Sequence, residues 1–516
     1  MGFAQRAIME VPVVRHGGKA ITAVAVLAAL VPAQAHARPE PSVPTSLRVS
    51  EIQGTGPASQ IVGAISTLSL VVTATADGGF WAQSSLPDDD PKTSDGIFVR
   101  TGAAAETGDL VLAHGVVAER DGLTEFTADT VEVMSHGAPL PVPVPFDGRD
   151  AESLEGMRVA PSSTVALGPS SEGRVAIKPG LVLAGVPDMN TGDSLLGPQT
   201  GIVDGTHVVV LSAAPQVVPG PVTPRATRAQ FPGELALASV NVRNLDPSDD
   251  PGRFSALADE IVNGLAAPDL VLLQGVEDNS GPDQDGTVAD DQTIAQLIDE
   301  ISSVGGPDYD WRAVDPVDDS DGGEPGGNPR VGYLFRTDRG LGFTDRPGDS
   351  VTATSVDADG DLTLSPGRLS PADPAWKDTR KPLAAQFSWA GRRLVVVNGH
   401  WTADGPPSGS AAPQRKEQAK NVAAFVATIR DPATLVVVAG EFNDTIPLQG
   451  LQDLSERLPR QDRYSKVVEG RRTATDRILV TPSTAPHAKD FAYVRWNADF
   501  SWSHGDADPA IVRLVP

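Results

Sequence analysis

Short hydrophobic stretches separated by glycine and aspartate turns dominate the first half of the chain. Segments such as "QIVGAISTLSLVVTATADGGFWAQ", "DGIFVRTG" and "GDLVLAHGVVAERDG" place β-branched residues between such turns, which is typical of strands. Roughly five strands within residues 45–140 predict a small β-barrel. A second β-rich stretch follows over residues 141–214, and the proline-rich segment 215–233 is expected to be a linker.

From residue 234 onward the pattern changes to strands that alternate with helices. "GRFSALADEIVNGL" and "DQTIAQLIDEISSVGG" carry apolar residues at helical spacing, whereas "APDLVLLQG", "RRLVVVNGH" and "TLVVVAGE" are short apolar runs that are typical of buried strands. Residues 234–516 are therefore predicted to form an α/β sandwich in which helices flank mixed sheets. The segment "DPVDDSDGGEPGGNP" is too polar and too rich in glycine to belong to the core.

Composition narrows the classes of function. The 516 residues include 67 acidic and 41 basic side chains, which gives a net charge of −26. Such a surface disfavours nonspecific binding to nucleic acid or anionic lipid unless divalent cations intervene. The chain has no cysteine, which excludes disulfides, thiolate zinc sites and a cysteine nucleophile.

The N-terminus has the features of an export signal. Arg15, His16 and Lys19 precede the apolar run "AITAVAVLAALVPA", and "AHA" ends at Ala37 with the small-x-small form of a cleavage site. Residues 1–37 are therefore predicted to be a signal peptide, the mature protein to be secreted and extracellular, and no membrane contact to remain after cleavage. A membrane anchor is the less favoured alternative, because the apolar run is short and contains Pro32.

Polar side chains collect where the strands of the C-terminal half end. In α/β sheets the loops at one end of the strands form the binding site. Carboxylate and amide oxygens suit Mg²⁺, Mn²⁺ or Ca²⁺ better than zinc, and a neighbouring histidine can transfer a proton. One such residue alone is usually a turn or cap residue, but six strand ends share the pattern, which predicts metal-assisted phosphodiester hydrolysis. The residues are Asn241, Gln274, Gly275, Glu277, Asn398, His400, Glu441, Asn443, Asp476, Asp506 and Asp508.

Ordered motifs along almost the whole chain resemble the secreted bacterial nucleases of the endonuclease/exonuclease/phosphatase superfamily. The C-terminal motifs are "NVRNL", "APDLVLLQGVEDN", "GGNPRVGYLF", "TRKPLAAQF", "VVVNGHW", "GEFND" and "DRILV", and "SEIQGTG", "GFWAQ", "TSDGIFVRTG" and "ESLEGMRV" precede them. The resemblance implies an α/β fold, a C-terminal four-layer deoxyribonuclease-I-like sandwich over residues 234–516, preceded by an OB-fold-like β-rich domain. It also implies a divalent cation, Mg²⁺ or alternatively Mn²⁺ or Ca²⁺, and nucleic acid as a partner, and it implies no protein partner.

The resemblance assigns roles to individual residues. His400 matches a histidine that contacts the phosphate or leaving group, and Asn443 matches the asparagine that positions the attacking water. Asp476 and Asp506 match the aspartates that begin the D-H-I-L-V motif and lie within the S-D-H motif. Asn241 matches an asparagine that hydrogen-bonds beside the metal and phosphate.

Further roles concern charged side chains. Glu277 and Glu441 are expected near the metal, and Arg330 and Arg380, from "GGNPRVGYLF" and "TRKPLAAQF", are expected to bind substrate. Glu441 replaces an aspartate of the family, which moves the carboxylate by one methylene, more than the roughly 0.5 Å tolerance of a preorganised site.

Two further departures remove functional groups. Gly275 stands where the family has a metal-binding glutamate, and Ala507 stands where it has a catalytic histidine. Glu277 lies two residues beyond Gly275, about 6–7 Å along the strand, so it reaches the ion only if the backbone shifts. Arg477 and Gly399 also replace a histidine and an asparagine of the family.

Two functions follow from this mixture of retained and lost residues. The first is a secreted, metal-dependent phosphodiesterase or nuclease with impaired activity, because loss of an acid–base group alone costs about 10²–10⁴ in rate. The second is a catalytically inactive extracellular binding protein on a nuclease scaffold, which Gly275 and Ala507 favour. In the N-terminal module, Phe80 and Trp81 are candidates for base stacking, but Trp81 is expected to lie in the core.

Overall fold

The computed structural model describes residues 46–88, 90–178, 180–205, 208–403, 411–501, 505 and 507–516. The predicted signal peptide and the predicted catalytic residue Asp506 lie outside these residues. None of the helices in the described ranges has the length and apolar character that crossing a bilayer requires.

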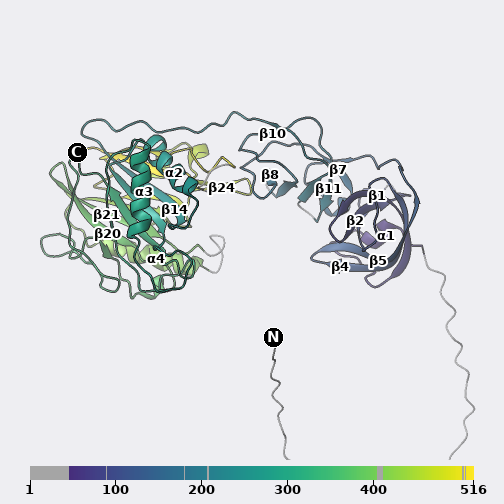
Figure 1. Ribbon diagram of the computed structural model, residues 1–516, viewed down its shortest axis with the longest axis horizontal. Helices are drawn as coiled ribbons and strands as arrows, with labels where there is room; N and C mark the ends of the chain where they lie inside the picture. Colours follow the sequence, from purple (N-terminus) through teal and green to yellow (C-terminus); the bar gives the residue numbers. More distant parts are fainter. Residues whose placement is uncertain are drawn as a thin grey trace, which may run out of the picture. The chain divides into compact units, whose positions relative to one another are not determined.

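The first β-rich stretch closes into a barrel (Figure 1). Its strand order is β1-β2-β3-β5-β4, with β3 parallel to β5 and the other pairs antiparallel. Trp81 is 6% exposed, and its ring centroid lies 4.9 Å from that of Phe98, so the expectation that Trp81 belongs to the interior is confirmed. The assignment of this barrel as OB-fold-like stays a prediction. The elements are α1 (Val49–Gln53), β1 (Ile65–Ala76), β2 (Gly79–Ser84), β3 (Gly96–Arg100), β4 (Leu110–Arg120) and β5 (Leu123–Ser135).

A smaller sheet follows in the order β6-β7-β11-β12-β9-β8, beside the two-stranded pair β10-β13. The segment expected as a linker contains β13 and makes specific contacts with the C-terminal half. Thr227 donates its backbone N–H to the carbonyl of Gly264 at 2.8 Å, and Arg228 forms an ion pair with Glu234 at 2.7 Å. The elements are β6 (Val144–Phe146), η1 (Glu152–Leu154), β7 (Arg158–Pro161), β8 (Arg174–Lys178), β9 (Leu181–Ala184), β10 (Ser194–Leu195), β11 (Gly201–Asp204), β12 (Val208–Leu211) and β13 (Val217–Val218).

The C-terminal half contains two large sheets packed face to face, which confirms the mixed α/β architecture predicted for it. The first sheet has the order β16-β17-β15-β14-β28-β27 and the second β18-β20-β21-β22-β26-β23, with β19 paired to β20. The strands of the first sheet are β14 (Leu235–Leu245), β15 (Leu270–Val276), β16 (Asp310–Ala313), β17 (Arg330–Phe335), β27 (Ala488–Tyr493) and β28 (Ala510–Leu514). Those of the second are β18 (Gly342–Phe343), β19 (Gly367–Arg368), β20 (Leu383–Trp389), β21 (Arg392–His400), β22 (Leu435–Glu441), β23 (Gln452–Asp453) and β26 (Asp476–Val480).

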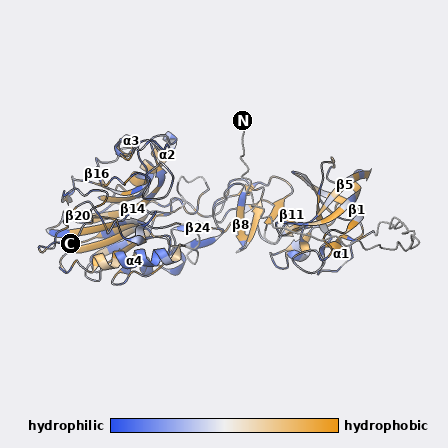
Figure 2. Ribbon diagram, turned by 90° about the horizontal axis from the view of Figure 1, so that it is seen from below, coloured by the Kyte–Doolittle hydropathy of each residue, from blue (hydrophilic) through white to orange (hydrophobic). Residues whose placement is uncertain are grey.

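Helices cover the outer face of each sheet, so the domain has four layers. Leu272 and Val437 belong to the core between the sheets, whereas Leu273 packs toward α2 and α3, and Val438 packs toward α4. Because both faces of these strands are buried, their sequences are continuous apolar runs (Figure 2). The remaining elements are α2 (Pro251–Asp259), η2 (Glu260–Gly264), α3 (Asp291–Ser303), η3 (Pro374–Trp376), α4 (Ala412–Val426), η4 (Leu454–Arg457), η5 (Arg460–Asp462), β24 (Lys466–Val468) and β25 (Arg471–Thr473).

The glycine-rich segment 315–329 differs from expectation, because part of it is buried. Asp321 is 2% exposed and lies 2.6 Å from the ammonium group of Lys381 and 3.0 Å from the guanidinium of Arg368. Asn328 is 3% exposed and donates to the carboxylate of Asp278 at 3.0 Å. Ion pairs and hydrogen bonds with distant parts of the chain bring this polar segment into the interior.

Candidate active site

Strand pairing brings the predicted residues to one end of the two sheets. In the first sheet β14 and β15 are parallel, with Asn241 opposite Gln274. In the second sheet β21 and β22 are parallel, with His400 opposite Glu441. The antiparallel strand β26 begins at the same end, where Asp476 pairs with Glu441. Parallel strands end at the same edge of a sheet, which explains the convergence.

The carboxylate of Glu441 lies between the two sheets and connects them. The Nδ2 group of Asn241 donates a hydrogen bond to Oε2 of Glu441, and Nε2 of His400 lies 3.2 Å from the same oxygen. Glu441 is 6% exposed and His400 is 7% exposed. Asn241 and His400 therefore hold this carboxylate in a defined position.

His400 is an uncharged imidazole in this environment. Burial, and then the positive charge of Arg380, hold its pKa well below the usual value of histidine. The contact with Glu441 favours the tautomer in which Nε2 carries the proton. Nδ1 of His400 is buried and has no hydrogen-bond partner among the described residues.

The backbone closes the space beside Gly275, where the family has a glutamate. Gly275 has a φ of +76° and lies at an irregularity in the pairing of β15. A Cβ atom at this position would lie 3.1 Å from both Oδ1 of Asn241 and the backbone nitrogen of Asn244, and 3.2 Å from that of Arg243. Arg243 and Asn244 themselves have positive φ values of 54° and 57°, so β14 folds over the site of the missing side chain.

Glu277 does not replace the missing metal ligand in ionised form. It is 0% exposed, and neither carboxylate oxygen has a hydrogen-bond partner among the described residues. Burial, followed by the negative charges of Glu324 and Asp246, raises the pKa of Glu277 to about 8. The carboxyl group packs against Gly327, where an added Cβ would lie 2.5 Å from its Cδ. A protonated carboxyl group is a poor ligand for a divalent cation.

Within the described ranges, no group of three or more histidine, aspartate and glutamate side chains is arranged to hold a metal ion. At the family's metal position Gly275 supplies no ligand, and Glu441 already accepts a hydrogen bond from Asn241 and lies 3.2 Å from Nε2 of His400. Among the described residues, which do not include Asp506, the site therefore lacks the set of ligands for the divalent cation that the resemblance implied.

The two arginines predicted to bind substrate have different environments. Arg330 is 2% exposed, forms an ion pair with Asp315 at 2.6 Å and lies 3.6 Å from Asp290. Arg380 is 9% exposed, and its buried Nε has no hydrogen-bond partner among the described residues. Burial lowers the pKa of Arg380, whereas the negative charges of Glu441 and then Asp321 raise it. Arg380 is thus a buried cation among acidic groups at the site.

The other predicted residues have mainly structural partners. Asn443 has a φ of 49° and donates its Nδ2 to the carbonyl of Trp401 at 3.1 Å. Asp476 is 3% exposed and accepts a hydrogen bond from Oγ of Ser465 at 2.8 Å. The carbonyl of Ala507 accepts a hydrogen bond from Nδ2 of Asn497 at 3.0 Å. The roles assigned to Asn443 and Asp476 stay predictions.

Two neighbouring charged residues serve the fold. Arg477 forms an ion pair with Asp453 at 2.6 Å. Asp508 pairs with Arg495 at 2.7 Å and accepts hydrogen bonds from three consecutive backbone N–H groups. Sequence reasoning missed the buried ion pairs of Asp321 with Arg368 and Lys381. The sequence feature that could have indicated such a pair is the basic residue Lys381, which belongs to "TRK" at the start of the "TRKPLAAQF" motif.

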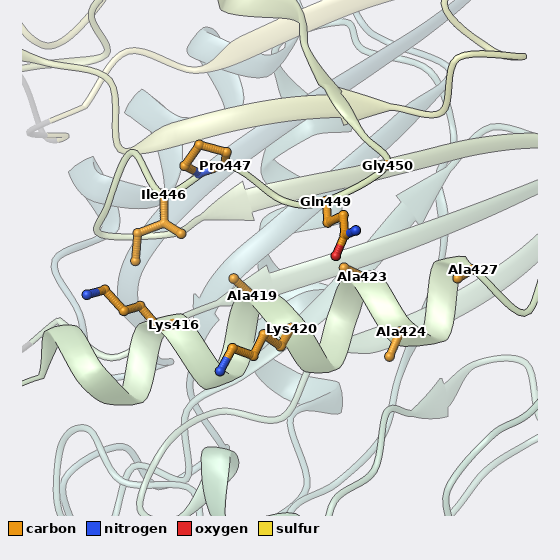
Figure 3. Close-up of a pocket in the computed structure, with 10 residues that line it drawn as sticks. All are labelled: Lys416, Ala419, Lys420, Ala423, Ala424, Ala427, Ile446, Pro447, Gln449 and Gly450. Carbon is orange, nitrogen blue, oxygen red and sulfur yellow. The ribbon is translucent and has the colours of Figure 1, made fainter.

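A groove of about 730 Å³ lies elsewhere, between α4 and the segment 446–450 (Figure 3). Alanines of α4 and two lysines, Lys416 and Lys420, line one side, and Ile446 and Pro447 line the other. None of the candidate site residues lines this groove, so the site is defined by the strand ends and not by the groove.

Comparison with solved structures finds distant similarities, which cover 55% of this chain. Humanized TDP2 of D. rerio shares 18% identity, with a TM-score of 0.37, over 55% of this chain and 100% of that one. D. rerio TDP2 complexed with a single-strand DNA product also shares 18% identity, with a TM-score of 0.37, over 55% of this chain and 99% of that one. An endonuclease/exonuclease/phosphatase family protein of Bacteroides thetaiotaomicron shares 17%, with a TM-score of 0.35, over 55% and 98%. These similarities are too distant to assign a substrate or an activity.

No curated protein matches the sequence significantly. The family model described as "Endonuclease/Exonuclease/phosphatase family" matches residues 238–502, which is slightly more than half of the 516 residues. The matched range contains the strand ends that form the candidate site in both sheets, from Asn241 to Asp476. The chain therefore belongs to the endonuclease/exonuclease/phosphatase family.

Proposed function

We propose that this protein is a secreted phosphodiester-binding member of its family whose metal-dependent hydrolysis is weak or absent. The observation that supports this proposal is the close approach of neighbouring atoms to Gly275. An added Cβ there would lie 3.1 Å from Oδ1 of Asn241 and 3.1 Å from the backbone nitrogen of Asn244. The side chain of the glutamate that anchors the metal in the family is absent here, and neighbouring atoms would have to shift by a few tenths of an ångström to admit even a Cβ. The retained polar groups at the strand ends support binding of a phosphodiester.

Residual hydrolysis is the second candidate function. It is favoured by the retention of Asn241, His400 and Asn443 at the strand ends. Burial holds the pKa of His400 well below its usual value, and an uncharged imidazole is the form that takes a proton from a nucleophile. Family enzymes of this class generally depend on a divalent metal, and Glu441 would be its remaining carboxylate ligand.

Incubation of the purified protein with plasmid DNA and Mg²⁺, Mn²⁺ or Ca²⁺, with and without a chelator, separates the two candidates. We expect no chelator-sensitive nicking above the level of a His400→Ala control. Rapid nicking that the chelator and His400→Ala both abolish would instead establish the hydrolase. A contaminating nuclease is recognised because its nicking persists in the His400→Ala preparation.

Binding is measured by fluorescence anisotropy with labelled DNA and RNA oligonucleotides. The net charge of −26 disfavours nonspecific association, so saturable binding indicates a local site. Dextran sulfate serves as a polyanion control. Absence of saturable binding to both DNA and RNA, in the presence and in the absence of divalent cations, would refute the proposed function.

The predicted signal peptide supports export as part of the proposal. Secretion of the full-length precursor is tested by N-terminal sequencing of the protein from the culture medium. We expect the mature chain to begin at Arg38, directly after Ala37. Retention of the apolar segment in a membrane fraction would support the anchor alternative.

The barrel's strand order, with a parallel β3–β5 pair, supports its assignment as an OB-fold-like module. Phe80 is 1% exposed and Trp81 is 6% exposed, so neither offers a free face for base stacking. We assign this module a structural role.

A further inference from the structure

A second groove lies in the N-terminal half of the described chain, between the loop from β2 to β3 and the segment that leads through β6 to η1. Its volume is about 810 Å³. Phe146, Leu154 and Met157 supply apolar lining, and prolines from both sides add to it. None of the candidate site residues lines this groove, so it is separate from the strand ends of the C-terminal half.

The two sides of the groove are held together by direct contacts. Oε1 of Gln83, in β2, accepts a hydrogen bond from the backbone N–H of Arg158 at 2.8 Å. The backbones of Gly96 and Gly156 also touch, because a Cβ at Gly96 would lie 2.2 Å from the carbonyl carbon of Gly156. The groove is therefore preformed, and a preformed surface lowers the entropic cost of binding.

The groove accepts hydrogen bonds and offers few donors. Among its described lining residues, four prolines have no N–H to donate, and four aspartates only accept hydrogen bonds when ionised. Arg149, the one arginine of this lining, already pairs with Asp147 at 2.6 Å, and its hydrogen bond lowers the pKa of that carboxyl to about 2. A bound molecule therefore has to supply hydrogen-bond donors and positive charge. The aspartates are Asp90, Asp95, Asp147 and Asp150.

Exposed apolar side chains extend this surface beyond the groove. Val142 belongs to the lining and is 85% exposed, and Leu86, the neighbour of the lining residue Pro87, is 72% exposed. Apolar surface that is rimmed by polar residues is typical of protein–protein contacts. A molecule that covers both side chains and fills the groove is larger than a small metabolite.

The edge strand beside the groove limits how a partner can bind. β6 is the outermost strand of its sheet, and its central residue is Pro145. Proline has no N–H to donate to an added strand, which protects such an edge from strand pairing. Recognition at this groove therefore depends on side chains.

We propose that this groove binds a basic, extended segment of a partner protein. Apolar side chains of the segment enter between Phe146 and Leu154, and its lysine or arginine side chains pair with the aspartates of the lining. Charge complementarity supports this assignment, because carboxylates outnumber basic groups four to one in the described lining. The inference goes beyond the proposed function, which concerns the C-terminal strand ends, and the family resemblance did not imply such a partner.

The test measures fluorescence anisotropy of a short, labelled peptide of alternating lysine and valine with the full-length mature protein. We expect saturable binding. A peptide of lysine and serine and a peptide of glutamate and valine should each bind at least about tenfold more weakly, because the first lacks apolar side chains and the second lacks positive charge. Equal binding of the lysine–serine peptide would overturn the inference, since charge alone would then explain the association.

Variants of the protein test the location. The double variant Asp90→Asn with Asp150→Asn should weaken binding roughly tenfold, and asparagine tolerates the positive φ of 51° at Asp150. The double variant Asp77→Asn with Asp129→Asn is the matched control, because it removes the same charge from exposed positions outside the groove, and it should bind like the wild type. Equal effects of the two double variants would overturn the inference.

Ser153→Trp places a large side chain in the groove and should abolish binding, with thermal unfolding as the check that this variant is folded. Hydrogen exchange of the wild type with the lysine–valine peptide should show protection over residues 83–95 and 141–157. Protection confined to other parts of the chain would overturn the inference. Sedimentation tests a second copy of this chain as the partner: a dimer that Val142→Asp converts to a monomer would replace the basic segment by self-association.

Discussion

The side-chain amide of Asn241 donates a hydrogen bond to the carboxylate of Glu441, joining β14 of one sheet to β22 of the other. His400 approaches the same oxygen at 3.2 Å. Residues that would surround a phosphate and its metal in the family thus also contact one another. These contacts make the two strand ends mutually dependent in structure, which can be measured independently of any activity.

Asn241→Ala should therefore destabilise the protein by about 1–3 kcal/mol, because the buried carboxylate of Glu441 loses a donor. Urea denaturation measures this change. In a double-mutant cycle with Glu441→Gln, the two substitutions should be non-additive by about 0.5–3 kcal/mol, as expected for residues in contact. Asn263→Ala, at an exposed asparagine of η2, is the control and should change stability by less than about 0.5 kcal/mol. Additive effects of the Asn241 and Glu441 substitutions would contradict the contact.

Gly275→Ala should cost about 1–3 kcal/mol, since a non-glycine residue at this φ of +76° is strained. The methyl group would also press on Asn241 and on the backbone of β14. Gly102→Ala is the matched control, because a Cβ there has nothing within 4 Å and its φ is not positive. Comparison of the two variants by urea denaturation tests the prediction, and equal stabilities would show that β14 moves aside freely.

The pH dependence of stability should include a contribution from Glu155. Burial, the largest cause, raises the pKa of Glu155 to about 7 from a usual value of 4.5. The folded state therefore binds a proton more tightly than the unfolded state. The stabilising contribution is complete below pH 4.5 and is lost as the pH rises through about 7.

Glu155→Gln tests this contribution, because the amide keeps an acceptor for the N–H of Thr124, now 3.0 Å from the carboxylate. The variant should be more stable than the wild type above pH 7, by on the order of 1–3 kcal/mol, and the difference should shrink toward pH 4.5. Calorimetry across this pH range provides the measurement. A constant difference between the two proteins at every pH would show that Glu155 does not titrate there.

The sequence predicted the scaffold better than the environment of the site. Continuous apolar runs identified the buried strands, and polar residues after them identified the edge where Asn241, His400 and Glu441 meet. Periodicity and local turn signals are enough for such elements. Asp321 was expected in an exposed loop because its partners, Arg368 and Lys381, lie far away in the sequence. Long-range ion pairs have no local signature.

Gly275 illustrates the same limit at the site itself. Its identity in the sequence showed that a carboxylate was missing, but not that its φ is positive or that β14 occupies the adjacent space. The unpaired state of Arg380 likewise depends on which carboxylates its neighbours bind. Backbone conformation and competition among charges are properties of the folded chain, and they decide here what the site can bind.

Restoring the family's residues therefore should not restore metal-dependent cleavage. In a variant with Gly275→Glu, Glu441→Asp and Ala507→His, the new glutamate meets Asn241 and the backbone of β14. The shorter aspartate also withdraws from Asn241 and His400, which now hold Glu441. We expect no chelator-sensitive plasmid nicking, and no rise of the unfolding temperature with Mg²⁺, which a ligand specific for the folded state would cause.

The variant with only Glu441→Asp and Ala507→His is the control, because it leaves the backbone around Gly275 undisturbed. If the triple variant nicks DNA in Mg²⁺ and the double variant does not, the backbone over Gly275 yields to a side chain and the lost carboxylate alone explains inactivity. If neither nicks DNA and both still bind the labelled oligonucleotide in EDTA, binding at the site does not depend on a divalent cation. The backbone of β14 then limits metal binding, since its atoms lie close to the position where the family's glutamate would begin.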